Sequence, residues 1–452
     1  MVMEAQSLLK FVQVLLCATL ILPITSDLMM ECGFVVQTMF PGKGEKQKSK
    51  LVKKGVISIN FITPFVLTIL EKIMKFNTNF SVFIISLILF FSCKGKTYQR
   101  VEIDIFGEIG PLNINIEKIL PLETLDHSLI GEVSKVRYNE GRYYVLDRLV
   151  SQNLFLFDQD GNFLKRLSRG RGPGEVLSPI EFVIDSAARS VFVWDTGTHY
   201  LSEYDLNLNF KSAEFIEDLF LTHAEDIGNG LWLIYNPVPV KEDNGELGYF
   251  LYSIYDLNNK NYLAKIFPIK SDLINLGAMM PISVSQNRVL FSAPFSNFLY
   301  SLQDSESGIY REEFLFNFGS LTLHKNDIEK GISHVYKEAR EGKIIIPFYG
   351  IGENREFISF NFSLYGRDNF LLFSKKTKGS FYSETIFQEK ILPKCRLIGS
   401  FGDNQFLAFA DPIDVLSFFQ YQADLYEMVS KIHDLSNPCI IIFSVRENEN
   451  SQ

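Results

Sequence analysis

Two neighbouring stretches of the chain are variants of one repeating unit. The first contains residues 143–147 and 157–158, and the second contains residues 191–195 and 204–205. In both, an apolar strand pattern ends in aspartate, and these aspartates are 48 positions apart (195 − 147 = 48). Propeller blades repeat at roughly 40–50 residues, and such sheets are stable when they stack face to face in a ring. The repeat therefore predicts a β-propeller.

Weaker copies of the unit continue toward the C-terminal end. Short apolar runs at 231–235, 289–291 with 298–300, 370–373 and 406–409 each follow a turn signal. Counting these runs predicts about six blades. Aromatic residues make up 14% of the chain, which suits pleated, half-buried strands. The predicted fold class is therefore all-β, a six-bladed β-propeller with short helical insertions.

Helical periodicity marks two expected insertions, at residues 324–343 and 413–433, which we expect to cap one face of the ring. We also expect the ring to close by pairing an N-terminal strand near residues 101–106 with a C-terminal strand at 439–445. A blade completed from both chain ends leaves no open sheet edge.

The N-terminal region has a different character. Three apolar stretches precede residue 95, and none reaches the length of about 20 apolar residues that spans a bilayer comfortably. In the third, Met74 and Lys75 precede an apolar core at 80–91, and Ser92 and Cys93 close it. This is the layout of a secretory signal peptide. We predict a lipoprotein signal peptide at 74–92, lipidation of Cys93, a linker at 93–100 and the propeller at 101–452.

The position of this signal has a consequence for the residues before it. Signal peptides act at the N-terminus of a chain, so residues 1–73 are predicted to be an upstream leader that precedes the true start at Met74. The alternative interpretation is an N-terminally anchored or multi-pass membrane protein, with Cys93 buried at the end of a membrane helix.

The candidate ligand-binding residues are Arg169, Arg171, Asp147 and Asp195. The two arginines flank Gly170 and would present a basic rim to an anionic ligand. Their loop lacks the Gly-Lys-Ser/Thr of a P-loop and precedes a strand, which favours a tight connection between blades. The aspartates would bind a cation if they met at the centre of the ring. More often, such side chains accept hydrogen bonds from the following turn.

The sequence shows no motif of a serine hydrolase, a zinc site or a disulfide framework. The chain has no Gly-x-Ser-x-Gly motif, and its six histidines lack zinc-site spacing. Beyond Cys93, only Cys395 and Cys439 follow in the sequence, and Cys439 has the pattern of a small core residue. We therefore predict no cofactor and no metal site. The net charge of −9 argues against nucleic acid as a partner.

These motifs together carry a family resemblance. The Ser92-Cys93 lipobox, the strand-ending aspartates, the loop at 170–175 followed by 182–185, and the closing segment 437–443 look like the six-bladed β-propeller lipoproteins of Bacteroidetes. These proteins are distant relatives of NHL-repeat propellers. The resemblance implies a lipid-anchored outer-membrane protein, and the basic residues Lys94 and Lys96 after the cysteine favour the periplasmic side.

The resemblance implies a fold and an envelope location more than an activity. We expect a binding or interaction module whose partners are the membrane, through the lipid, and a peptide, protein or glycan ligand. Two alternatives stay open. Related propellers include metal-dependent enzymes of the lyase or lactonase type, and a structural component of an envelope complex is the third possibility.

Overall fold

The computed structural model describes residues 98–103, 112–217, 219–236, 239–241, 247–268, 281–285, 288–384, 391–401, 404–419, 432–433 and 436–447. These residues belong to one compact unit, residues 94–452. The predicted leader, signal peptide and Cys93 lie outside the described residues.

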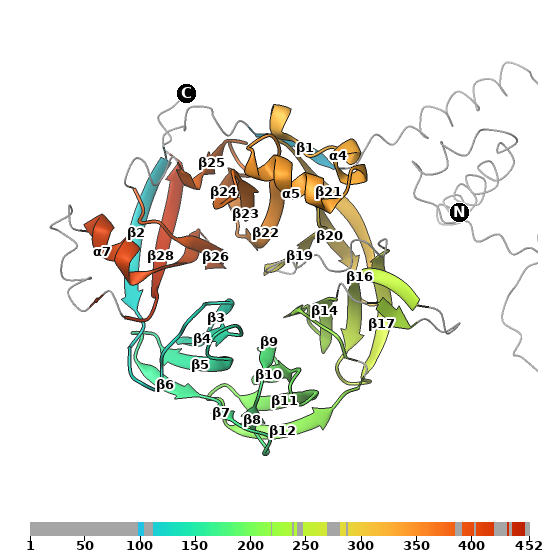
Figure 1. Cartoon of the computed structure of the whole chain (residues 1–452). Coiled ribbons are helices and arrows are strands. Elements are labelled where there is room, and N and C mark those ends of the chain that lie inside the picture. The colour runs from blue at the N-terminus through green and yellow to red at the C-terminus, as the bar shows by residue number, and fades with distance from the viewer. Residues whose placement is uncertain are drawn as a thin grey trace, which may run out of the picture. The chain divides into compact units, whose positions relative to one another are not determined.

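The strands form six sheets of four or five strands that stand around a ring, and we number these blades in chain order (Figure 1). This confirms the predicted six-bladed β-propeller. Blade 1 consists of β3 (Lys135–Asn139), β4 (Arg142–Asp147), β5 (Asn153–Asp158) and β6 (Phe163–Arg166). Blade 2 consists of β9 (Pro179–Asp185), β10 (Ser190–Asp195), β11 (Tyr200–Asp205) and β12 (Phe210–Phe215). Blade 3 consists of β13 (His223–Asp226), β14 (Leu231–Tyr235), β16 (Leu247–Asp256) and β17 (Asn261–Pro268), with β15 (Pro239–Lys241) beside β16.

Of the remaining blades, blades 4 and 6 each include a strand that comes earlier in the chain than blade 1. Blade 4 consists of β18 (Ile282–Ser285), β19 (Arg288–Ser292), β20 (Phe298–Asp304) and β21 (Ile309–Asn317), with β1 (Gln99–Glu102) as a fifth strand. Blade 5 consists of β22 (Ile346–Glu353), β23 (Phe357–Leu364), β24 (Arg367–Ser374) and β25 (Ser380–Tyr382). Blade 6 consists of β26 (Arg396–Phe401), β27 (Gln405–Ala410), β28 (Cys439–Glu447) and β2 (Leu112–Pro121).

Blade 6 closes the ring, as predicted, but with a different N-terminal strand. The C-terminal strand β28 pairs antiparallel with β2, from Pro121 opposite Cys439 to Leu112 opposite Glu447. The expected strand near 101–106 was therefore wrong. Val101 belongs to β1, which pairs in parallel with β21 of blade 4. Both segments have strand character, and the longer β2 covers the edge of β28.

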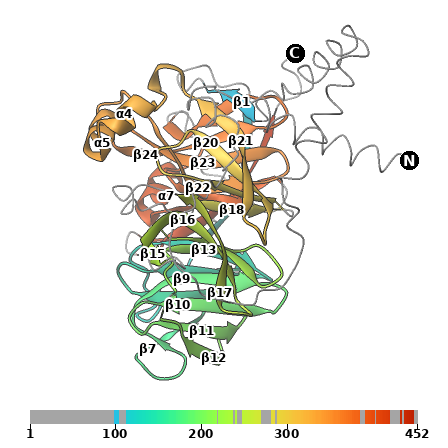
Figure 2. The ribbon, with the colours of Figure 1, turned by 90° about the vertical axis from the view of Figure 1, so that its right-hand side faces the viewer.

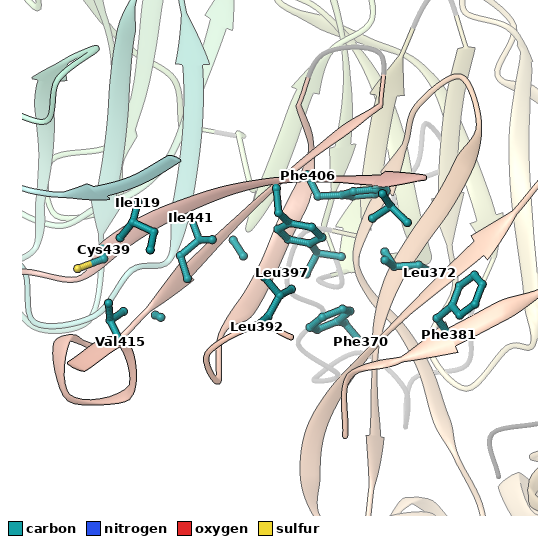
Figure 3. Close-up of a cluster of buried hydrophobic side chains, with 14 of the residues drawn as sticks. Ile119, Phe370, Leu372, Phe381, Leu392, Leu397, Phe406, Val415, Cys439 and Ile441 are labelled. Carbon is teal, nitrogen blue, oxygen red and sulfur yellow. The ribbon is translucent and has the colours of Figure 1, made fainter. Parts of the chain in front are cut away.

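Apolar side chains fill each interface between adjacent blades. In β4, for example, Tyr143 and Val145 pack against blade 6, whereas Tyr144 and Leu146 pack against blade 2. Both faces of an inner strand are thus buried, which explains why the strand-Asp repeats are almost wholly apolar. The interface between blades 5 and 6 contains Phe370, Leu372, Phe406 and further side chains from both sheets (Figure 3).

The two faces of the ring differ because strands alternate in direction within each blade. One face carries the connections from second to third strands and from one blade to the next. We call it the insertion face, since α4 (Lys325–Glu329), α5 (Ile332–Arg340) and α7 (Pro412–Phe419) stand there, at the left in Figure 2. The opposite face, here called the hairpin face, carries tight turns such as the β20–β21 turn.

The first predicted helical insertion is confirmed, but it consists of two helices, α4 and α5, in place of one. The expected helix at 324–343 is divided by Gly331, whose φ of 97° lies in the left-handed region. Val335 and Ala339 are buried, as the periodicity requires, but Tyr336 is exposed. Of the second expected helix, α7 is present, and residues 420–431 lie outside the described part.

Closure yields a direct test. Deleting residues 437–452 removes β28, which lies between β2 and β27, so β2 loses its partner strand and β27 keeps only its pairing with β26. We expect the truncated protein to lose cooperative thermal unfolding, measured by circular dichroism. A control that lacks residues 448–452 keeps β28 and should melt like the full chain. Equal melting temperatures for the two truncations would contradict closure by β2 and β28.

Candidate functional site

The first strands of blades 1, 2 and 3, which are β3, β9 and β13, bring charged side chains together. Lys135 Nζ of β3 lies 2.7 Å from Glu181 Oε1 of β9 and 3.0 Å from Glu225 Oε1 of β13. Arg137 of β3 also pairs with Glu225. Lys135 donates further hydrogen bonds to the carbonyl oxygens of Phe182 and Ala224, at 2.9 and 3.0 Å. We call Lys135, Arg137, Glu181, His223 and Glu225 the central ion network.

His223 joins the two carboxylates of this network. Its Nδ1 lies 2.8 Å from Glu181 Oε2, and its Nε2 lies 3.1 Å from Glu225 Oε1. His223 is thus a buried histidine with partners on both sides, on the first strand of blade 3.

Burial and charge act in opposite directions on the network carboxylates. Burial favours the neutral acid, but the charges of Lys135 and His223 outweigh it and lower the pKa of Glu181. At Glu225, burial is outweighed by Arg137 and Lys135, which hold its pKa well below the usual range. Both carboxylates are therefore ionised at neutral pH. A buried ion network of this kind fixes the relative position of three blades.

A second charged group links blades 4 and 5. Glu353, at the end of β22, is 3% exposed and lies 2.7 Å from Lys375 Nζ and 3.3 Å from Arg288 Nη1. Ser285 Oγ of β18 donates to the same carboxylate at 3.2 Å. In this group, as in the central ion network, basic side chains compensate the carboxylates.

The donor set of the central ion network bears on metal binding. Glu181 comes from blade 2, His223 and Glu225 come from blade 3, and blade 1 contributes the cations Lys135 and Arg137. The ammonium group of Lys135 occupies the position between two carboxylates that a bound cation would take. Within the described ranges, no group of three or more His, Cys, Asp or Glu side chains is arranged to hold a metal ion.

Asp147 is used by the fold of its own blade. Its carboxylate is buried and accepts backbone N–H groups from Val150 at 2.9 Å and Ser151 at 3.0 Å in the following turn, and from Gly131 at 2.8 Å. Burial opposes ionisation, yet these backbone donors lower the pKa of Asp147. The side chain thus links Gly131, which precedes the first strand of blade 1, to the end of the second strand, β4.

Asp195 repeats the arrangement in blade 2. It accepts N–H groups from Gly197 at 2.7 Å and Thr198 at 3.1 Å after the strand, and from Leu177 at 2.5 Å before the blade. The turn interpretation thus accounts for both aspartates. A second series ends the third strands and accepts N–H groups of the next turn: Asp158, Asp205, Asp256 and Asp304.

The loop that contains Arg169 and Arg171 runs from β6 to β9 and connects blade 1 to blade 2 on the insertion face. Two-residue strands β7 (Ser168–Arg169) and β8 (Glu175–Val176) pair in parallel at its base. Glu175 Oε2 accepts the Gly172 N–H at 2.8 Å, so this donor is already engaged. Gly174 has a φ of 76°, and a Cβ there would lie 2.8 Å from Phe210. This geometry fits the predicted tight connection between blades.

The side chains of the loop point outward. Arg169 and Arg171 are both exposed, and Arg169 Nη2 donates to Gln152 Oε1 at 3.0 Å. Ligand binding by Arg169, Arg171, Asp147 and Asp195 stays a prediction. Of these four, the two arginines are the ones whose charge faces solvent.

The cysteines of the ring are free thiols. Cys439 is fully buried in the core between blades 5 and 6, as expected, and burial raises the pKa of Cys395 and Cys439 to about 12. No helix among the described residues is long and apolar enough to cross a membrane.

The central ion network was missed at the sequence level because it has no local motif. Its members stand on the first strands of consecutive repeats, with Glu181 following Lys135 by 46 positions (181 − 135 = 46) and Glu225 following Glu181 by 44 (225 − 181 = 44). Charged residues that recur at the blade period, on the first strand of each repeat, are the signal that identifies it.

Comparisons with known proteins agree with the ring. Residues 116–444 match a family described as a domain of unknown function, DUF4934. A candidate exported protein of Bacteroides fragilis is similar in structure, with a TM-score of 0.61 and 17% identity over 78% of this chain and all of that one. A member of the DUF4221 family from Bacteroides vulgatus has a TM-score of 0.47 and 10% identity over 75% and 100% of the two chains. No curated protein matches the sequence.

Replacing Glu225 by Gln tests the central ion network. The substitution leaves Lys135 and Arg137 without their shared carboxylate, and breaking a buried pair typically costs about 3 kcal/mol or more of unfolding free energy. Since the folded-state pKa of Glu225 is depressed, its contribution is present above the unfolded pKa of about 4.3 and is lost as the pH falls. Urea unfolding should show the largest gap between wild type and Glu225→Gln at neutral pH.

The gap should narrow as the pH falls below about 4, where Glu225 takes up a proton in the unfolded chain before it does so in the folded protein. Glu140→Gln is the control, because Glu140 pairs with Arg189 at the exposed surface and such pairs contribute about 1 kcal/mol or less. A gap that stays constant from neutral to acidic pH would show that the Glu225 charge does not stabilise the ring.

Proposed function

Because the chain belongs to the family defined by the domain of unknown function DUF4934 and forms a six-bladed propeller, we propose that it is a lipid-anchored recognition module of the cell envelope. Its ligand is a peptide, protein or glycan, and it binds without a cofactor. The protein is anchored through Cys93 on the periplasmic side of the outer membrane.

The central ion network is the observation that favours recognition over metal-dependent catalysis. A metal enzyme of the lyase or lactonase type needs open carboxylate, imidazole or amide donors that converge on one cation. Here the carboxylates of Glu181 and Glu225 are compensated by Lys135. This arrangement supports a structural centre, with the ligand bound on the surface.

The insertion face is the surface that supports recognition best. It carries the exposed Arg169 and Arg171, and the helices α4, α5 and α7 rise from it (Figure 2). Connections are free to vary on a rigid scaffold, which is why binding residues concentrate there. The two arginines would pair with carboxylate or phosphate groups of a ligand in bidentate fashion.

The envelope location rests on two observations. The order of basic residue, apolar core and Ser92-Cys93 is that of a lipoprotein signal peptide. The similar propeller of Bacteroides fragilis is named as a candidate exported protein. On this proposal, residues 1–73 are absent from the mature protein and Cys93 is its first residue.

Mass spectrometry of the native protein tests the anchor. We expect the mature chain to begin at Cys93 with a diacylglyceryl group, and to partition with membranes. Cys93→Ser should lose the lipid and the membrane retention, because a serine hydroxyl does not form the thioether. The matched control Cys395→Ser should keep both. Peptides from residues 1–73 at the abundance of ring peptides would contradict the proposal.

A further inference from the structure

Three basic side chains lie close together in the chain at the outer rim where blade 1 meets blade 2. Lys165 belongs to β6, the outer strand of blade 1, and Arg169 and Arg171 follow within six positions (171 − 165 = 6), in β7 and the loop after it. Figure 1 shows β6, β7 and β8 near β12, the outer strand of blade 2. We call Lys165, Arg169 and Arg171 the basic rim cluster.

The partners of this cluster are amide oxygens. Lys165 Nζ donates to Asn209 Oδ1 at 2.8 Å, and Arg169 Nη2 donates to Gln152 Oε1 at 3.0 Å. In the part of the chain that the structure describes, Arg171 has no hydrogen-bond or ion-pair partner. An amide is neutral, so it positions a cation without cancelling its charge.

Two exposed arginines elsewhere on the ring are arranged differently. Arg189 lies 2.6 Å from Glu140, and Arg311 lies 2.8 Å from Glu313, so a carboxylate compensates each of them. The whole chain has a net charge of −9. The basic rim cluster is therefore a local positive feature on an acidic protein, and such a feature attracts anions.

Two carboxylates lie near the cluster, and each is engaged within its own loop. Glu175 Oε2 accepts the Gly172 N–H at 2.8 Å. Asp205 accepts the backbone N–H of Asn209 at 2.8 Å and its side-chain amide at 2.9 Å. Burial opposes ionisation of Asp205, but Asn209 and the charge of Lys165 lower its pKa. Three cations against two carboxylates leave this part of the rim positive.

The loop that carries the arginines is held in a fixed shape. Arg169 pairs with Val176 in the parallel β7–β8 ladder, and the Gly170 N–H donates to Val176 O at 3.0 Å. A Cβ at Gly174 would lie 2.8 Å from Phe210, so the loop packs directly on the first residue of β12. A preorganised site loses less conformational entropy when a ligand binds.

An exposed aromatic ring completes this surface. Phe210 is 40% exposed, and its ring packs edge-on against Tyr204, with the ring centroids 6.0 Å apart. It follows Asn209 directly in the chain, so the ring is next to the amide that accepts from Lys165. Aromatic rings contact the apolar faces of sugars, amides bond to hydroxyl groups, and guanidinium groups bind phosphate or carboxylate. This combination fits an anionic sugar.

We propose that the basic rim cluster binds a glycan that carries phosphate or carboxylate groups. This inference rests on the proposed recognition function and narrows its ligand from a peptide, protein or glycan to one class. Arg169 and Arg171 pair with the anionic group, which both phosphate and carboxylate present as two oxygens to an arginine fork. Phe210 contacts the sugar ring beside that group.

Sensor surfaces coated with polymers test the site on the purified full chain. The probes are phosphomannan, polygalacturonate and neutral mannan, with polyphosphate as a polyanion that lacks sugar. We expect at least one anionic glycan to bind about tenfold or more tighter than mannan and polyphosphate, with binding that weakens as the salt concentration rises. The two anionic glycans distinguish a phosphate ligand from a carboxylate ligand.

The double substitution Arg169→Gln with Arg171→Gln should weaken this binding about tenfold or more, because hydrogen bonds to charged groups are the strong ones. Phe210→Leu keeps apolar packing but removes the ring face, and should weaken binding to the glycan severalfold. The matched control, Arg189→Gln with Arg311→Gln, removes the same charge from paired sites and should bind like wild type. Thermal melting confirms that each variant is folded.

Polyphosphate binding as tight as that of the anionic glycans, or an equal loss in the control variant, would overturn the proposal by showing attraction through charge alone. Failure to bind either anionic glycan would overturn it as well, as would unchanged binding by the Arg169 and Arg171 double variant. A peptide or neutral glycan that binds wild type and this double variant equally would overturn the rim site but leave the proposed recognition function intact.

Discussion

The pairing of β2 with β28 is the constraint on which the rest of the structure depends. A propeller blade buries both of its faces against neighbours, so an incomplete ring would expose two apolar sheet faces at once. Nine pairs of residues join the two chain ends in blade 6. Each apolar interface, such as that of Phe370 and Phe406 in Figure 3, stays buried because this closure keeps every blade packed between two neighbours.

The interior of the ring combines this apolar packing with a few compensated charges. Lys135 and Glu181 are each 3% exposed, a position that charged residues occupy when they are paired. Removing one partner would leave the other charge buried, which makes the network a fixed part of the scaffold. On the proposed function, recognition belongs to the connections on the insertion face, because connections vary without disturbing the blades.

The sequence predicted the architecture because the repeat of apolar strands and aspartates is local. Asp147 and Asp195 mark equivalent turns, and their spacing alone indicates stacked blades. The local sequence does not show which strand closes the ring, because β1 and β2 both have strand character. Tertiary pairing decides: β2 pairs with β28, and β1 pairs with β21. The central ion network was also not predicted, because Lys135 and Glu181 are 46 positions apart and come into contact only when blades 1 and 2 stack.

Metal analysis combined with thermal-shift measurements on the purified ring tests the central claim most directly. If the protein is a recognition module, it should contain no stoichiometric metal, and chelator should leave its melting temperature unchanged. A peptide or glycan of the cell envelope should raise that temperature, because a ligand that binds the folded state stabilises it. A stoichiometric metal whose removal lowers the melting temperature would contradict the account and favour a metal-dependent enzyme.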